Sequence, residues 1–245
     1  MRNHEFNRLK YQKNGFIGVF TRKHFSSKIS LFLAHSRLTP NQITFFSLVL
    51  ALVGIYFLST GERLNLIIAG ILIFLSKIFD AVDGELARLK GLVTERGGWL
   101  DGISDRFKEN MLFLGLTFGL YHQSPSPVVW LYGFLAIISI HMLSIVLEHT
   151  GKMDPGILQR TQEGTFIVKI ARRLGIKPQY LALQADVYFF ITSVLIIANQ
   201  LKLILWFYMV VMNFYWLIIV FLVYKKKKLI ARIPPSRIPP LKRLI

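Results

Sequence analysis

The chain alternates long apolar stretches with shorter polar and basic ones. A transmembrane helix needs about 20 mostly apolar residues, and six stretches reach or approach that length. They lie at residues 42–60, 64–88, 99–121, 127–148, 185–200 and 203–224. The fifth is the shortest. We therefore expect an all-α integral membrane protein with six transmembrane helices.

Two further segments combine large apolar side chains with basic ones and are too polar to span a membrane. They cover residues 16–33 and 166–174. This pattern is typical of amphipathic helices that lie in the headgroup region of a bilayer. Their basic residues either bind anionic headgroups or, in the case of Arg172 and Arg173, bind a phosphorylated acceptor at the mouth of a cavity.

Composition and charge support the membrane interpretation and orient the chain. Of the 245 residues 53% are hydrophobic, and 30 Lys+Arg face only 13 Asp+Glu. The basic residues gather before the first span, after the last, and in the second and fourth connections. By the positive-inside rule, both termini and the second connection are cytoplasmic. Charge so clearly sorted by membrane side argues against nucleic-acid binding.

The same patterns predict one membrane domain with two basic flanks. Residues 1–37 form a cytoplasmic basic segment, residues 38–224 the six-span domain, and residues 225–245 a basic, proline-containing cytoplasmic tail. Cysteine is absent, which excludes disulfides and thiolate metal ligands.

Residues 80–105 place several carboxylates where the second and third spans meet. On a helix, Asp80, Gly84 and Arg88 share one face because they are four residues apart. Asp83 lies one turn from Asp80. Ionisable groups at the edge of a bilayer are costly, so they usually mark a functional site.

The next helix repeats this spacing. Gly97, Asp101 and Asp105 again lie four residues apart on one face. Like charges brought together repel one another unless a cation lies between them. Two adjacent helices would thus bring three or four carboxylates to one divalent-metal site. Three charged residues that follow Asp105 are candidates for internal salt bridges: Arg106, Lys108 and Glu109.

The spacing D-x2-D-G-x2-A-R-x8-G-x3-D-x3-D matches, at every position, the signature of the CDP-alcohol phosphotransferase family, which the chain therefore resembles. The segment Leu38–Thr44 is similar to the Thr-Pro-Asn-x-x-Thr segment that opens the first span in many members. Residues 14–17 and 89–91 are most similar to the branch that contains di-inositol-phosphate-phosphate synthases.

The resemblance implies a metal-dependent transfer from a CDP-alcohol donor to an acceptor alcohol, with release of CMP. Two Mg²⁺ or Mn²⁺ ions would be held by four aspartates, which are Asp80, Asp83, Asp101 and Asp105. Asp105 would also take the proton of the acceptor hydroxyl. Hard divalent cations prefer such oxygen ligands, and a pair of ions can stabilise both the entering and the leaving oxygen.

The resemblance also implies a nucleotide side of the site, made of Gly84, Ala87, Arg88, Gly97, Asn41 and Thr44. The two glycines would let the cytidine approach the helix backbones, or would serve helix packing alone. Arg88 would bind the diphosphate, brace an acidic ligand, or extend to the membrane surface.

The acceptor is the least specified part of the site. Lys77 lies one turn before Asp80 and is a counter-charge, an acceptor-phosphate ligand or an interface residue. The branch resemblance favours inositol phosphate as the acceptor. A phospholipid synthase that uses a CDP-linked lipid with glycerol phosphate, serine or inositol is the main alternative. The family resemblance further implies a homodimer.

Two other classes of membrane protein also use aspartates in this way. Membrane prenyltransferases hold magnesium diphosphate with Asp-x-x-Asp motifs, but usually place two of them on well-separated helices. A divalent-cation transporter would need polar residues that continue across the bilayer, whereas the second and third spans are apolar beyond the motif.

Overall fold

The computed structural model describes residues 25–153 and 185–230, and within these ranges all regular structure is helical, as the apolar pattern predicts. The segment 166–174, with Arg172 and Arg173, and the tail after residue 230 lie outside the described residues. In chain order the helices are α3 (Ser27–Ala34), α4 (Pro40–Ser59), α5 (Arg63–Lys90), α6 (Glu95–Gln123), α7 (Pro127–Met153), α10 (Ala185–Ile197), α11 (Leu201–Phe207), the π-helix η3 (Tyr208–Met212) and α12 (Asn213–Ile230).

Four helical stretches are long and apolar enough to cross a membrane. They are Pro40–Ser59, Arg63–Lys90, Pro127–Thr150 and Leu201–Lys225, and they coincide with the first, second, fourth and sixth predicted spans. The predicted third and fifth spans are helices too, but they do not meet this criterion. Helix α6 carries the charged motif in its first half, and α10 has 13 residues, or about 20 Å at 1.5 Å per residue.

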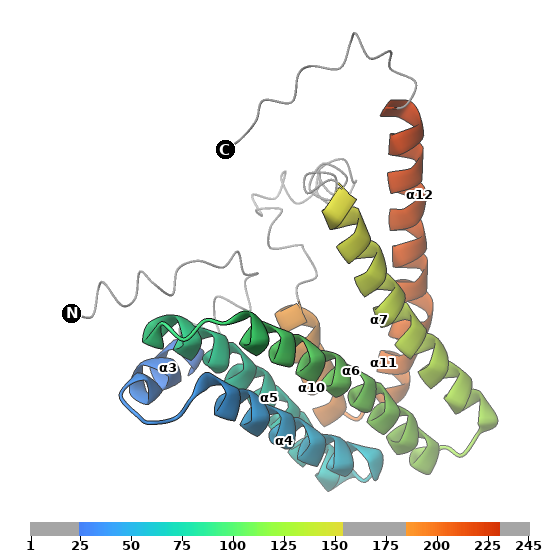
Figure 1. Cartoon of the computed structure of the whole chain (residues 1–245). Coiled ribbons are helices and arrows are strands. Elements are labelled where there is room, and N and C mark those ends of the chain that lie inside the picture. Colours follow the sequence, from blue (N-terminus) through green and yellow to red (C-terminus); the bar gives the residue numbers. More distant parts are fainter. Residues whose placement is uncertain (1–24, 154–184, 231–245) are drawn as a thin grey trace, which may run out of the picture.

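Helices α4, α5 and α6 run side by side, with α10 against α5, while α7 and α12 extend together to one side (Figure 1). Small residues allow α4, α5 and α6 to approach one another closely. A methyl group on Gly54 of α4 would lie 3.0 Å from Cβ of Leu72, and one on Gly115 of α6 would lie 2.8 Å from Cγ2 of Ile55. These approaches fix the register in which the motif helices face each other.

Capping interactions define the helix termini that lie near the motif. Thr39 forms a capping box with Gln42 at the start of α4. The hydroxyl of Thr94 accepts a hydrogen bond from the backbone N–H of Gly97 at 3.1 Å, which starts α6. Helix α5 ends at Gly91 in the left-handed conformation, with φ 68°. Both motif halves are therefore helical throughout, as the spacing requires.

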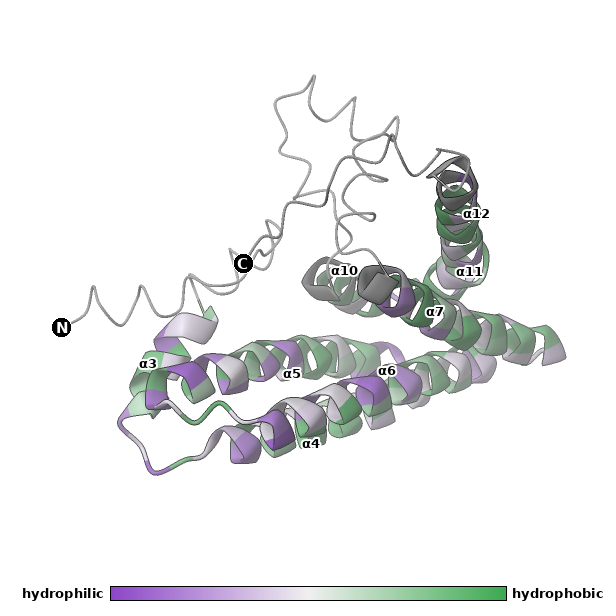
Figure 2. Ribbon diagram, turned by 45° about the horizontal axis from the view of Figure 1, so that its top comes forward, coloured by the Kyte–Doolittle hydropathy of each residue, from purple (hydrophilic) through white to green (hydrophobic). Residues whose placement is uncertain are grey.

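Helix α3 packs against the motif end of α5, where Figure 2 shows hydrophilic residues gathering. Two buried serines, Ser26 at the N-cap of α3 and Ser30 within the helix, donate hydrogen bonds to the Glu85 carboxylate at 3.0 and 2.8 Å. Glu85 is itself fully buried. The opposite side of α3 exposes Phe32 at 79%. A helix is thus confirmed in the second half of the predicted interfacial segment, joined to α5 through a buried carboxylate.

Candidate functional site

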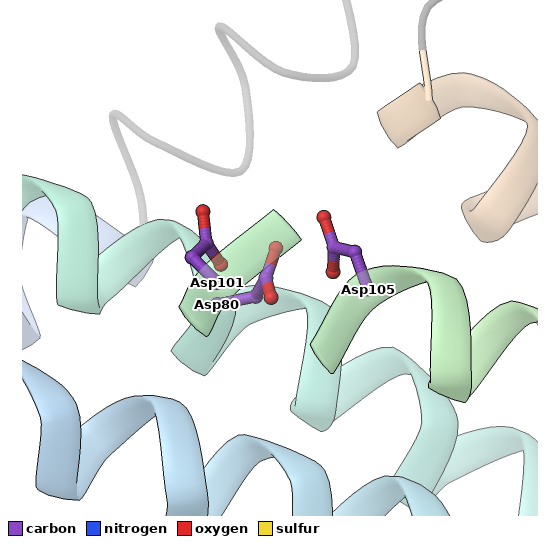
Figure 3. A group of neighbouring side chains, drawn as sticks. All are labelled: Asp80, Asp101 and Asp105. Atoms are coloured by element: carbon purple, nitrogen blue, oxygen red, sulfur yellow. The ribbon is translucent and has the colours of Figure 1, made fainter. Parts of the chain in front are cut away.

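Three of the four motif aspartates converge in the structure. Asp80 comes from α5, and Asp101 and Asp105 come from successive turns of α6. Each offers an oxygen, and these oxygens all lie within 4.8 Å of one another. Figure 3 shows the three carboxyl groups projecting from the two helices into one space. The prediction that the two helices share a carboxylate site is therefore consistent with the geometry.

One oxygen of this cluster has no hydrogen-bond partner in the described part of the chain. It is Oδ1 of Asp101, which is buried, and Oγ of the neighbouring Ser104 is in the same situation. A buried polar atom without a partner is costly. Hard cations such as Mg²⁺ and Mn²⁺ bind carboxylate oxygens. The residues present therefore fit a divalent cation, and they offer it an oxygen that lacks a partner.

Two lysines also enter the cluster. The Lys77 ammonium on α5 lies 2.6 Å from Oδ2 of Asp80 and 3.9 Å from Oδ2 of Asp105. The Lys108 ammonium on α6 lies 2.5 Å from Oδ1 of Asp80 and 2.9 Å from Oδ1 of Asp105. These contacts support the counter-charge interpretation of Lys77, and its contact with an acceptor phosphate stays a prediction. For Lys108 the sequence predicted a salt bridge but not the contact with Asp80 across the helix pair.

Lys108 is held firmly in this position. Only 6% of it is exposed, and its ammonium also donates to the Ser47 hydroxyl of α4 at 3.3 Å. Ser47 in turn donates to the backbone oxygen of Ser76 at 3.1 Å. Lys77 instead lies 5.3 Å from the centre of the Phe189 ring. Lys108 thus ties α4, α5 and α6 together at the cluster.

Asp83 differs from the other three aspartates. It is 4% exposed, and its Oδ2 accepts a hydrogen bond of 2.6 Å from the Thr44 hydroxyl of α4. It does not belong to the group whose oxygens lie within 4.8 Å. Its place among the metal ligands remains a prediction. Thr44, expected near the nucleotide, contacts this aspartate and orients it.

Of the two motif glycines, Gly84 faces open space, whereas Gly97 lies close to two polar side chains. A methyl group on Gly84 would meet only the Arg88 guanidinium, at 3.5 Å. One on Gly97 would lie 3.1 Å from the Thr94 hydroxyl and 3.6 Å from Oδ1 of Asn41. This differs from Gly54 and Gly115, whose neighbours are helix-packing side chains. Helix packing alone therefore does not explain the glycine at position 84.

A small cavity of about 20 Å³ lies beside Asp105. Its polar lining consists of Ser76, Lys77, Asp105 and Lys108, and its apolar lining includes Leu112 and Phe189. This volume accommodates about one water molecule. A water-sized group therefore has room next to the Asp105 carboxylate.

Other polar groups of α6 have partners away from the cluster. Arg106 and Glu109 form the expected internal salt bridge at 2.7 Å. The ring of His141 on α7 is 2.8 Å from Oδ1 of Asn110. His149 contacts the backbone oxygen of Ile145 in its own helix. Both histidines of α7 thus have partners away from the carboxylate cluster.

Comparison with known sequences covers both motifs. A model of the CDP-alcohol phosphatidyltransferase family matches residues 37–176. The archaetidylinositol phosphate synthase of Pyrococcus horikoshii is 32% identical over 138 residues, which cover 54% of this chain and 69% of that protein. The phosphatidylinositol phosphate synthase of Corynebacterium glutamicum is 30% identical, covering 51% of this chain and 59% of that protein.

Two longer relatives share the name bifunctional IPC transferase and DIPP synthase. The one from Thermococcus kodakarensis is 29% identical over 57% of this chain, and the one from Aquifex aeolicus is 25% identical over 89%. The matches span 31% and 46% of these proteins, respectively, so this chain corresponds to less than half of either. With the family match extending over more than half of its length and including both halves of the aspartate motif, the chain belongs to the CDP-alcohol phosphatidyltransferase family.

Proposed function

We propose that this chain is a membrane transferase that moves a phospho-alcohol or phosphatidyl group from a CDP-alcohol to an acceptor hydroxyl. CMP is released and a phosphodiester is formed. The observation that carries the proposal is the convergence of Asp80, Asp101 and Asp105 within the region that matches the family. A solvated acidic loop would not bury Oδ1 of Asp101 without a partner.

In this proposal, two Mg²⁺ or Mn²⁺ ions are held by four aspartates, which are Asp80, Asp83, Asp101 and Asp105. A bound divalent cation offsets the charge of the pyrophosphate and stabilises the oxygens that enter and leave. Oδ1 of Asp101 supports the site most directly because it is buried and has no partner in the described residues. Asp83 is oriented by its hydrogen bond from Thr44 and lies one turn away on α5, where we propose it as the fourth ligand.

Asp105 is the proposed general base. Its side chain is 36% exposed, whereas that of Asp80 is 9% exposed, so an acceptor reaches Asp105 more easily. The acceptor oxygen attacks the phosphorus that carries the donor's alcohol, and the bond from this phosphorus to the CMP oxygen breaks. The proton of the acceptor hydroxyl passes to Asp105. The water-sized cavity beside this carboxylate leaves room for the acceptor hydroxyl.

The donor lies along the glycine faces of α5 and α6. Gly84 leaves the backbone of α5 accessible, and at Gly97 the polar side chains of Thr94 and Asn41 lie beside the backbone of α6. Arg88 lies over Gly84, where its guanidinium reaches a diphosphate. Ala87 keeps the next position of the α5 motif small.

The names of the relatives favour an inositol-containing acceptor. The proteins from Pyrococcus and Corynebacterium are named for inositol phosphate products. A lipid-linked donor is the second candidate, because a Drosophila melanogaster relative, 34% identical over 42% of this chain, is named CDP-diacylglycerol–inositol 3-phosphatidyltransferase. Lys77 is the described residue proposed to contact an acceptor phosphate, and Arg172 and Arg173 are proposed from the sequence alone.

The proposed enzyme crosses the membrane six times, with α6 and α10 as the third and fifth spans. Both termini and the active site then face the cytoplasm, where soluble cytidine nucleotides are available. We also propose a homodimer, on the family resemblance.

One assay tests the function directly. The purified chain is incubated with a panel of CDP-alcohols and acceptors, with Mg²⁺, Mn²⁺ or excess EDTA, and the products are identified by mass. We expect CMP and one phosphodiester to appear together, and both to disappear with EDTA. Full turnover after confirmed metal removal would refute the metal site. If none of the donor–acceptor pairs yields CMP, the transferase proposal is refuted.

A further inference from the structure

We propose that Lys108 is a built-in cation that couples divalent-metal binding to the CDP-alcohol donor. The metal binds weakly to the free protein because Lys108 already serves the carboxylates, and it binds tightly once the donor's pyrophosphate adds negative charge. This inference rests on the proposed metal-dependent transfer and concerns residues outside the family's signature.

The first observation is that the Asp80 carboxylate has both oxygens in ion pairs. Lys108 contacts Oδ1 at 2.5 Å and Lys77 contacts Oδ2 at 2.6 Å. Lys108 also contacts Oδ1 of Asp105 at 2.9 Å. A metal ion that coordinates Asp80 therefore shares an oxygen with an ammonium group or displaces it. In either case the ion approaches a positive charge.

The second observation is the charge balance. Three aspartates meet two lysines here, and Asp83 lies one turn from Asp80 on α5. With all of these groups charged, four carboxylates and two ammonium groups leave two negative charges. One divalent cation neutralises this remainder, and a second would make the site positive. A pyrophosphate brings negative charge of its own and offsets that excess. Occupancy by two ions is therefore expected only with the donor in place.

The third observation is that Lys108 cannot easily leave. It is 6% exposed, it donates to Ser47 at 3.3 Å, and the side of the adjoining cavity away from the aspartates includes the apolar residues Ala51, Ile55 and Leu112. Moving the ammonium away from the aspartates would place it among apolar groups, which is unfavourable. Its charge therefore remains close to an incoming ion.

Competition with the metal and a purely structural role predict opposite changes in metal affinity when Lys108 is removed. If Lys108 only joined the helices, its removal would loosen the cluster and weaken metal binding. If it competes with the metal, its removal strengthens metal binding in the absence of donor. Unit charges a few Å apart in a partly buried site interact strongly enough to change affinity at least ~10-fold.

The test measures Mn²⁺ affinity of the full-length purified chain by electron paramagnetic resonance of free Mn²⁺, with and without CDP. For the wild type we expect CDP to tighten Mn²⁺ binding at least ~10-fold. Lys108→Met should bind Mn²⁺ at least ~10-fold more tightly than the wild type without CDP, and should gain less from CDP. Lys202→Met removes the same charge from an exposed position at the start of α11 and should behave like the wild type.

Thermal unfolding of each variant separates competition from misfolding. A folded Lys108→Met with unchanged or weaker Mn²⁺ binding overturns this inference but leaves the metal site intact. No Mn²⁺ binding by the wild type, even with CDP, overturns both the metal site and the inference. If Lys108→Met does not fold, Lys77→Met tests the same competition from the other oxygen of Asp80. It should likewise tighten Mn²⁺ binding, and failure to do so would overturn the proposal.

Discussion

Replacing Gly84 by alanine should stabilise the protein and at the same time weaken donor binding. Gly84 lies inside α5, where alanine is favoured over glycine by about 1 kcal/mol. The added methyl group meets only the end of Arg88, at 3.5 Å, which is an ordinary contact. No steric penalty offsets the gain, so we expect the melting temperature to rise by roughly 2–4 °C.

Donor binding should change in the opposite direction. The methyl group would stand between Asp80 and Arg88 on the face along which we place the donor. A ligand that must retreat from this face loses contacts, and a tenfold loss of affinity corresponds to about 1.4 kcal/mol. We expect CDP to bind at least ~10-fold more weakly to Gly84→Ala, measured by calorimetry at saturating Mg²⁺.

Two glycines of α6 provide controls for Gly84. A methyl group on Gly98 would have nothing within 4 Å, so Gly98→Ala should gain stability as well and shows the effect of helix propensity alone. A methyl group on Gly119 would collide with the backbone oxygen of Leu58, so Gly119→Ala should lose stability. A Gly84→Ala variant that is destabilised, or that binds CDP normally, would show that position 84 serves packing and not the donor.

Three further predictions concern other parts of the site and the topology. Asp105→Asn should lower turnover at least ~10²-fold while CDP binding with Mg²⁺ survives, whereas Asp80→Asn should lose both; equal loss of binding would make Asp105 a ligand first. Glu85→Gln should destabilise the protein by about 2 kcal/mol in thermal unfolding, because its hydrogen bonds to two buried serines lose their charge; an unchanged melting temperature would contradict this. Cysteines placed at Ser124 and Ser236 should label from opposite sides of the membrane, since three proposed spans separate them, and labelling from one side would refute the six-span count.

The positions of the helices were predictable because apolar runs and caps are local signals. The second span was expected at 64–88 and the helix is Arg63–Lys90. The third was expected at 99–121, and its helix begins earlier, at Glu95, because Thr94 caps it. The carboxylate site was predictable for the same reason, since the spacing of the aspartates fixes the face of each helix that bears them.

The partners of the carboxylates were not predictable in this way. Lys108 is three residues from Asp105, so that ion pair follows from helix geometry. Its contact with Asp80 depends on the relative register of α5 and α6, which is set by the packing of both helices against α4. The bonds from α3 to Glu85 likewise join residues more than fifty positions apart. No spacing rule within one helix contains such information.

The contacts of α4 unite two motifs that are separate in the sequence. Thr44 and Ser47 are three residues apart and so share a face of α4. Thr44 donates to Asp83, and Ser47 accepts from Lys108. One turn earlier, Asn41 stands across from the glycine at the start of α6. The Thr-Pro-Asn-x-x-Thr segment is therefore a third wall of the aspartate site rather than merely the start of a span. It follows that changes on this face of α4 will act on the aspartates through their hydrogen bonds, without removing a carboxylate.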